Sequence, residues 1–282
     1  MKLRAFKQVD VFTGTAYRGN PLAVVLDGNG LDHDAMQRFA RWTNLSETAF
    51  VLTPTQVGAD YRVRIFTPGG ELPFAGHPTL GSCHAWLESG GLPKRQDFIV
   101  QECEAGLVRI RREAPRLAFA APPLKRSSPD PVLLAQVAVA LGVGAQQVLQ
   151  AQVLDNGPVW LGLLLESPRT VLELAPNHQE LERLGQKVGV AGIHPGAVPE
   201  GEPLLEVRAF AAPIGIQEDP VTGSLNASLA QWLIAGEHLP PRYVAAQGSC
   251  LGRAGRVHIA QDAGQVWVGG ESVSCIAGTV TL

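Results

Sequence analysis

The chain has 282 residues, of which 45% are hydrophobic and 17% are charged, and its formal net charge at pH 7 is −3. This length suffices for two lobes with cores of their own, because single cores stop growing near this size. A charge so close to neutral provides no basic surface for nucleic acid or for an anionic membrane. Four separated cysteines without a C-x-x-C spacing argue against a disulfide framework and against a zinc site.

The predicted elements of the first half are strands around one hydrophobic helix. The 31 glycines and 21 prolines of the chain imply many turns, which favours short strands over long helices. Apolar residues at helical spacing predict an amphipathic helix from Asp32 to Trp42 and a mostly buried helix from Pro78 to Leu87. The expected strands are 3–11, 22–26, 49–52, 61–66, 98–100 and 107–111.

A proline-rich segment, 120–131, is the best linker candidate, and after it the order of elements repeats. We expect helices at 132–141, near 178–188 and at 224–233, and strands at 159–165, 204–210, 243–247, 255–259, 265–269 and 274–280. The turn 155–158 before one strand is the apparent counterpart of the turn 19–21 before another. The sequence therefore predicts an internal duplication, with one hydrophobic central helix among strands in each unit.

No targeting or membrane segment is visible. Residues 1–12 lack the continuous apolar stretch and the small-residue cleavage site of a signal peptide. No stretch approaches the roughly 18 uninterrupted apolar residues that a membrane-spanning helix requires. Reduced thiols fit an intracellular setting. We therefore expect a soluble, cytoplasmic protein.

Two segments half a chain apart, 66–82 and 210–227, share one layout. Each has an apolar strand end, then a polar loop, then small residues that open an apolar helix. Helix N-termini present backbone N–H groups and the positive end of a dipole, so two of them suit a carboxylate. Carboxylates and protonatable groups lie in the same loops. The pattern indicates acid/base chemistry on a small carboxylate, held in a cleft between two similar lobes.

Two candidate residues of the first half each have a functional and a structural interpretation. Glu47 precedes a predicted strand and is either a general base with a raised pKa or a carboxylate that caps neighbouring N–H groups. His77 precedes Pro78, which suits the first turn of a helix. At that place a neutral imidazole could orient a substrate or relay a proton, and it could equally be hydrogen-bonded within the loop. His84 follows His77 by seven residues, about 10 Å along a helix, so the two do not form a metal pair.

The second half has a similar set. Asp219 precedes Pro220, and it either reaches His77 or a substrate amine or stabilises an Asx-type turn. Thr222, Gly223 and Ser224 would by themselves be a helix cap. Their pairing with the first loop favours a carboxylate clamp instead. The residues of this clamp are Gly76, Pro78, Thr79, Thr222 and Gly223. Glu71 has no assigned role.

Four motifs taken together resemble the PhzF family of phenazine-biosynthesis isomerase-like proteins. The motifs are 44–48 (NLSET), 73–79 (PFAGHPT), 215–224 (GIQEDPVTGS), and 247–248 with 252–253. The resemblance implies a diaminopimelate-epimerase-like α/β fold, in which two pseudo-symmetric lobes each wrap a curved, mainly antiparallel sheet around a central helix. It implies an N-terminal lobe of 1–119 that the last strand, about 271–282, rejoins, and a C-terminal lobe of 120–270. It also implies a homodimer and a cofactor-independent isomerase.

Carried over by position, the resemblance places the family's acid/base glutamate on Glu47, its histidine on His77, its aspartate on Asp219 and its helix-start serine on Ser224. More distant epimerases have a cysteine at each helix start. Here those positions hold Ala75 and Pro220, so racemisation by two thiols is not available.

The resulting hypothesis is an isomerase that moves a proton along a small unsaturated or amino carboxylate, with no cofactor, no metal and no nucleic-acid or membrane partner. No P-loop, no G-x-G-x-x-G and no G-x-S-x-G motif competes with it. Two alternatives stay open. One is an epimerase or racemase that uses Glu47 with His77 or Asp219. The other is a ligand-binding or scaffold protein that kept the cleft and lost turnover.

Overall fold

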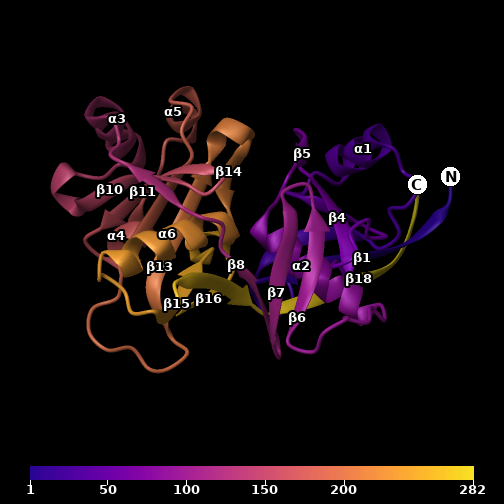
Figure 1. Ribbon diagram of the computed structural model, residues 1–282. Helices are drawn as coiled ribbons and strands as arrows, with labels where there is room; N and C mark the ends of the chain where they lie inside the picture. The colour runs from indigo at the N-terminus through magenta and orange to yellow at the C-terminus, as the bar shows by residue number, and fades with distance from the viewer. The chain divides into compact units, whose positions relative to one another are not determined.

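The computed structural model describes all 282 residues, and it is a mixed α/β fold with two compact units (Figure 1). The first unit comprises Met1–Ala120 with Gly269–Leu282, and the second comprises Ala121–Val268. None of its helices has the length and apolar character needed to cross a membrane. The predicted fold class is confirmed, because each unit is a mainly antiparallel sheet with one central helix.

The sheet of the first unit begins with the last strand of the chain. Its neighbours run in the order β18, β1, β2, β3, β4, β6, β7 and β8, and β5 adds to β4. Only β2–β3 and β4–β6 are parallel. The strands are β1 (Leu3–Val11), β2 (Asn20–Val25), β3 (Thr48–Leu52), β4 (Tyr61–Phe66), β5 (Glu71–Leu72), β6 (Phe98–Cys103), β7 (Gly106–Glu113), β8 (Arg116–Ala120) and β18 (Ser272–Thr281). The helices are α1 (His33–Thr43) and α2 (Gly76–Glu88).

The second unit repeats this topology. Its order is β9, β10, β11, β12, β13, β15 and β16, β14 adds to β13, and only β11–β12 and β13–β15 are parallel. The strands are β9 (Lys125–Ser127), β10 (Val148–Asp155), β11 (Val159–Leu165), β12 (Val188–Ile193), β13 (Pro203–Ala211), β14 (Ile216–Asp219), β15 (Arg242–Gln247) and β16 (Gly255–Asp262), and β17 (Gln265–Gly270) runs across the boundary after Val268. The helices are α3 (Pro131–Leu141), α4 (Pro168–Glu173), α5 (His178–Arg183) and α6 (Gly223–Ala235).

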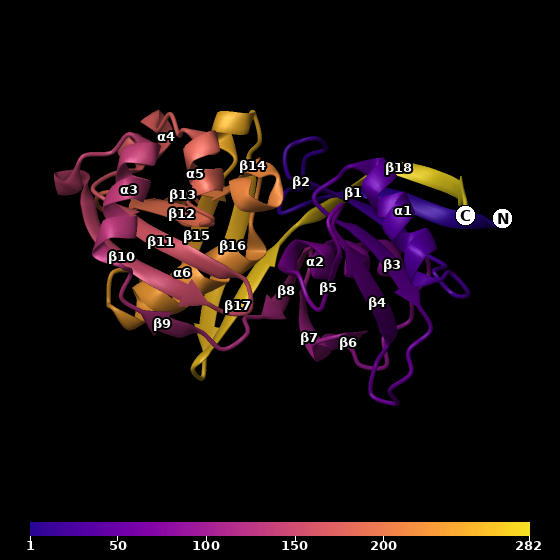
Figure 2. The same ribbon diagram turned by 90° about the horizontal axis from the view of Figure 1, so that it is seen from above.

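The central helices α2 and α6 correspond in the two units, and each packs against strands of its own unit (Figures 1 and 2). Close packing explains two glycines. A Cβ on Gly81 of α2 would lie 2.6 Å from Leu22 Cδ2, and a Cβ on Gly189 of β12 would lie 2.2 Å from Leu225 Cδ1 of α6. Nine of the 13 residues of each central helix are buried, which agrees with the mostly buried helix that the sequence predicts in the first unit.

Two predicted elements differ in the structure. The helix expected near 178–188 ends at Arg183, because Gly185 adopts a left-handed conformation with φ 67°. The residues that follow form strand β12, which the prediction missed. The proline-rich segment 120–131 is also not wholly irregular, since it contains β9, which pairs with β10.

Candidate functional site

In the first unit the structure brings Glu47 and His77 together. Helix α1 is capped by Asn44, which has a left-handed φ of 54°, and the chain then passes over Ser46 and Glu47 into β3. His77 is the second residue of α2. Its Nδ1 lies 3.4 Å from Oε2 of Glu47, and the two side chains are only 5% and 15% exposed. Two motifs separated by about thirty residues therefore meet at one buried place.

Burial controls the protonation of Glu47. It raises the pKa of the carboxyl from its ordinary value of 4.5 to about 7, against the smaller opposite effect of a hydrogen bond with Ser46. Oε2 is buried and accepts no hydrogen bond, although Nδ1 of His77 approaches it to 3.4 Å. A carboxyl whose pKa is near neutral can both remove and return a proton at physiological pH. This arrangement favours the general-base interpretation of Glu47 over that of a capping carboxylate.

Neither central helix has a side-chain cap at its N-terminus. The N-cap of α2 is Ala75, whose side chain has no acceptor. The N-cap of α6 is Thr222, but its hydroxyl donates to Oδ2 of Asp219 at 2.5 Å and makes no cap bond. The structural counterpart of Ala75 is therefore Thr222 and not Pro220. No side-chain oxygen caps the positive dipole end of either helix, and such a helix start suits an anion.

A buried amide network holds Asp219 and the start of α6. Gln247, at the end of β15, accepts from the Thr222 N–H at 3.0 Å and from Asn226 Nδ2 at 2.8 Å. Its Nε2 donates to the Asp219 carbonyl at 3.0 Å and to Thr222 Oγ1 at 2.9 Å. All the hydrogen-bonding capacity of this fully buried amide is thus used to fix one turn of chain.

Ser224 is held by two residues to which the sequence analysis gave no role. Trp160 Nε1 donates to Ser224 Oγ at 3.2 Å, and Asn156 Nδ2 donates to the Ser224 carbonyl at 2.9 Å. The serine hydroxyl accepts from the indole and so keeps its own proton for donation elsewhere. The one sequence feature that could have indicated Asn156 is its turn, which resembles the turn around Asn20. In the first unit, Asn20 accepts a hydrogen bond from Ser46 Oγ at 3.4 Å.

The other predicted residues also lie at the two helix starts. Thr79 is fully buried and accepts from Gln101 Nε2 at 2.9 Å, so its side chain faces β6. Gly76 and Pro78 are in the first turn of α2, and Gly223 is the first residue of α6. The predicted bond between Asp219 and His77 stays a prediction. No group of three or more His, Cys, Asp or Glu side chains stands together as metal ligands would.

The sequence matches a described family over nearly its whole length. The family is PhzC-PhzF, phenazine biosynthesis-like protein, and the match covers residues 9–278. The chain belongs to this family. It is 37% identical to antisense-enhancing sequence 1 of Schizosaccharomyces pombe over 99% of both chains. It is 33% identical to trans-2,3-dihydro-3-hydroxyanthranilate isomerase of Pseudomonas aeruginosa, covering 91% of this chain and 90% of the relative.

Solved structures show the same fold for this PhzF-family chain. A PhzF-family protein of Bacillus anthracis superposes with a TM-score of 0.86 at 23% identity, with full coverage of both chains. A predicted epimerase of Pseudomonas aeruginosa does so with 0.80 at 26% identity over 99% of both. A probable proline racemase of Agrobacterium radiobacter shares the fold at 13% identity, with a TM-score of 0.66 over 99% of this chain and 93% of the racemase. Family membership supports an enzyme of the isomerase or epimerase-like type.

Proposed function

We propose that this protein is a cofactor-independent isomerase that moves a proton between carbon positions of a small unsaturated or amino carboxylate. The observation that carries the proposal is the buried carboxyl of Glu47, whose pKa is about 7 and whose Oε2 lies 3.4 Å from His77 at the start of α2. The relative from Pseudomonas aeruginosa, named as an isomerase of a dihydro-hydroxyanthranilate, supports an unsaturated amino carboxylate as the substrate class.

In the proposed reaction, ionised Glu47 removes a proton from a carbon next to the unsaturated system. The electron pair left behind delocalises, and the negative charge that develops is stabilised by helix N-terminal N–H groups. Protonated Glu47 then returns the proton to a different carbon, so the enzyme ends in its starting state. The raised pKa matters because a carboxyl with an ordinary pKa would be too weak a base to abstract the proton efficiently.

We assign the remaining candidates to binding. The starts of the two central helices, at Gly76, Pro78 and Thr79 and at Thr222 and Gly223, bind the substrate through backbone groups. His77 orients the substrate beside Glu47. Asp219 accepts from a substrate amine, and Ser224 donates from the hydroxyl that Trp160 leaves available. We also propose that the protein is a homodimer.

Epimerisation is the second candidate, and the similarity to the predicted epimerase of Pseudomonas aeruginosa favours it. Glu47 would then remove the proton from one face of the carbon, and a second acid, His77 or Asp219, would deliver a proton to the opposite face of the same carbon. Neither Ala75 nor Thr222 at the helix starts can supply the thiols of a two-cysteine mechanism.

Proton NMR in heavy water tests the proposal. The probes are trans-2,3-dihydro-3-hydroxyanthranilate, simple cyclohexadiene carboxylates and a panel of amino carboxylates. The proteins are wild type, Glu47→Gln, and Glu88→Gln as a matched control at the far, exposed end of α2. We expect deuterium to enter a carbon position with wild type and Glu88→Gln, and not with Glu47→Gln.

The position of the label separates the candidates. Deuterium at a new carbon with a shifted double bond identifies an isomerase, and deuterium at the original carbon with inverted configuration identifies an epimerase. Equal exchange in wild type and Glu47→Gln would show that Glu47 is not the base. Binding of carboxylates without exchange at any carbon would favour the non-catalytic alternative.

A further inference from the structure

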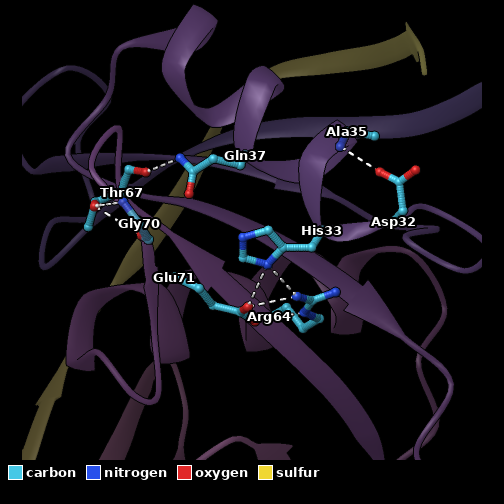
Figure 3. Close-up of polar contacts among 8 residues, drawn as sticks. All are labelled: Asp32, His33, Ala35, Gln37, Arg64, Thr67, Gly70 and Glu71. Atoms are coloured by element: carbon cyan, nitrogen blue, oxygen red, sulfur yellow. Dashed lines mark hydrogen bonds and ion pairs between the residues drawn. The ribbon is translucent and has the colours of Figure 1, made fainter.

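Both units carry an arginine–glutamate ion pair between corresponding strands. In the first unit Arg64 of β4 donates from Nε and Nη2 to the two carboxylate oxygens of Glu71 in β5, both at 2.6 Å (Figure 3). In the second unit Arg208 of β13 donates from the same two nitrogens to Glu218 in β14, both at 2.9 Å. Such two-pronged pairs fix orientation as well as distance.

The surroundings of the two pairs correspond as well. Each guanidinium lies over the ring of the phenylalanine two residues further along its strand, at 5.1 Å for Phe66 and 5.0 Å for Phe210. A histidine that begins a helix contacts the same ring in each unit, His33 of α1 and His178 of α5. The same arrangement of an arginine, a glutamate, a phenylalanine and a histidine therefore occurs in both units.

In the second unit this arrangement lies next to a candidate site residue. Glu218 and Asp219 are consecutive in β14, and consecutive strand residues point to opposite faces of a sheet. Arg208 holds Glu218 on one face. Asp219 is therefore turned to the other face, where its Oδ2 accepts from the Thr222 hydroxyl. A one-residue slip of β14 would exchange the two carboxylates between the faces.

Arg208 is itself firmly held. Its Nη1 donates to the carbonyls of Val171 and Leu174, at 3.2 and 2.9 Å, at the end of α4. The side chains of Arg208 and Glu218 are each only 6% exposed. The guanidinium thus ties β14 both to β13 and to the helix layer, which leaves the strand little freedom to slip or to rotate.

The first unit offers an internal comparison. There the residue after the paired glutamate is Leu72, which is apolar, and the pair is more exposed. The same ion pair is therefore next to a candidate acid in one unit and next to a leucine in the other. This difference separates a general effect of losing such an ion pair from an effect on Asp219.

We propose that Arg208 and Glu218 are positioning residues that set the register of β14 and thereby direct the Asp219 carboxylate toward Thr222 and the start of α6. The structural part of this proposal concerns where Asp219 points. Its consequence for turnover rests on the proposed function, in which Asp219 contacts the substrate.

Carbon-13 NMR of the side-chain carboxyl groups tests the structural part without any substrate. The proteins are wild type, Arg208→Lys and Glu218→Gln, with Arg64→Lys and Glu71→Gln as matched controls, and Asp219→Asn assigns the resonance. Lysine keeps the charge but loses the paired geometry, and glutamine keeps the shape but loses the charge, so the two variants disturb the pair in different ways. We expect the Asp219 resonance to shift in both second-unit variants and to stay unchanged in both controls.

An unchanged Asp219 resonance in Arg208→Lys and Glu218→Gln would overturn the proposal, and so would an equal shift in the controls. Where the heavy-water assay detects exchange, kcat should fall by about 10- to 100-fold in the second-unit variants, with a smaller change in KM, as expected for a misplaced group. Equal losses of kcat in all four variants would contradict a positioning role. If wild type exchanges no probe, the proposed function fails while the NMR result still decides the register of β14.

Discussion

Replacing Glu47 by glutamine should make the protein more stable at neutral pH, although it removes a candidate catalytic group. The reason is that burial raises the pKa of the carboxyl in the folded chain to about 7, whereas the unfolded chain titrates near 4.5. Holding this group ionised in the folded state therefore costs free energy. Glutamine has nearly the same shape and does not titrate, so the comparison isolates that cost.

The magnitude follows from the difference between the two pKa values. Each pKa unit corresponds to 1.36 kcal/mol, so a difference of about 2.5 units amounts to about 3 kcal/mol. Below pH 4.5 the carboxyl is protonated in both states and contributes nothing. Between pH 4.5 and 7 the unfolded state gains from ionisation and the folded state does not, so wild type loses stability relative to Glu47→Gln. Above pH 7 the full difference remains.

Urea unfolding of wild type and Glu47→Gln at a series of pH values between 4 and 8.5 measures this difference. Hydrogen exchange of peptides from residues 1–120 assigns it to the first unit. Glu71→Gln provides a control of opposite sign, since the hydrogen bond from Arg64 lowers the pKa of Glu71. The contribution of Glu71 is present above its unfolded pKa and is lost as the pH falls. A stability advantage of Glu47→Gln over wild type that stays constant or shrinks as the pH rises from 4.5 to 7 would refute the burial argument.

Further predictions concern the network, the packing and the reaction. Gln247→Leu should lower the free energy of unfolding by about 2–4 kcal/mol in urea titrations, because it strands buried donors and an acceptor; a loss below about 1 kcal/mol would contradict this. Gly81→Ala should cost about 1–3 kcal/mol by the same assay, since its Cβ meets Leu22. Gly70→Ala, whose Cβ meets nothing within 4 Å, should be close to neutral. The exchange rate should rise through about pH 7 as Glu47 ionises, and a rate independent of pH between 5 and 8 would argue against this base.

The sequence predicted the start of each central helix well, because those starts are marked by local chemistry. Pro78 lacks the N–H that a first turn leaves unused, and small residues precede both helices. It did not predict β12, because Gly189 and Gly192 weaken the strand pattern of that segment. Gly189 is needed where Leu225 approaches the strand, which is a contact between residues 36 positions apart. Such a tertiary requirement leaves no local signal.

In the candidate site, too, some residues are marked by the local sequence and others become important only through tertiary contacts. Glu47 and Asp219 stand out in the sequence because each is an acid at the edge of an apolar element. Gln247 belongs to one of the family motifs but receives no role from the sequence, and Trp160 does not stand out at all, because an amide or an indole in a strand is most simply interpreted as part of a core or a surface. Their importance comes from what lies opposite them once the strands pair. The supporting residues of a site are therefore harder to find from sequence than the acids they hold.

The duplication separates the scaffold from the chemistry. Each unit places a fully buried glutamine on the strand after its central helix: Gln101 donates to Thr79 in α2, and Gln247 accepts from Asn226 in α6. The acids are not repeated in this way. The residue before β12, which corresponds to Glu47 before β3, is Lys187, a residue whose pKa is lowered by burial.

The residue of β5 that corresponds to Asp219 is Leu72. Each unit thus has one acid at a place where the other unit has none. A duplicated scaffold permits this, because the ion pairs and the buried amides fix the strands and helix starts in both copies, whatever side chain stands at the variable position. In the first unit the free position became the buried carboxyl beside α2. In the second it became the carboxylate that β14 turns toward α6.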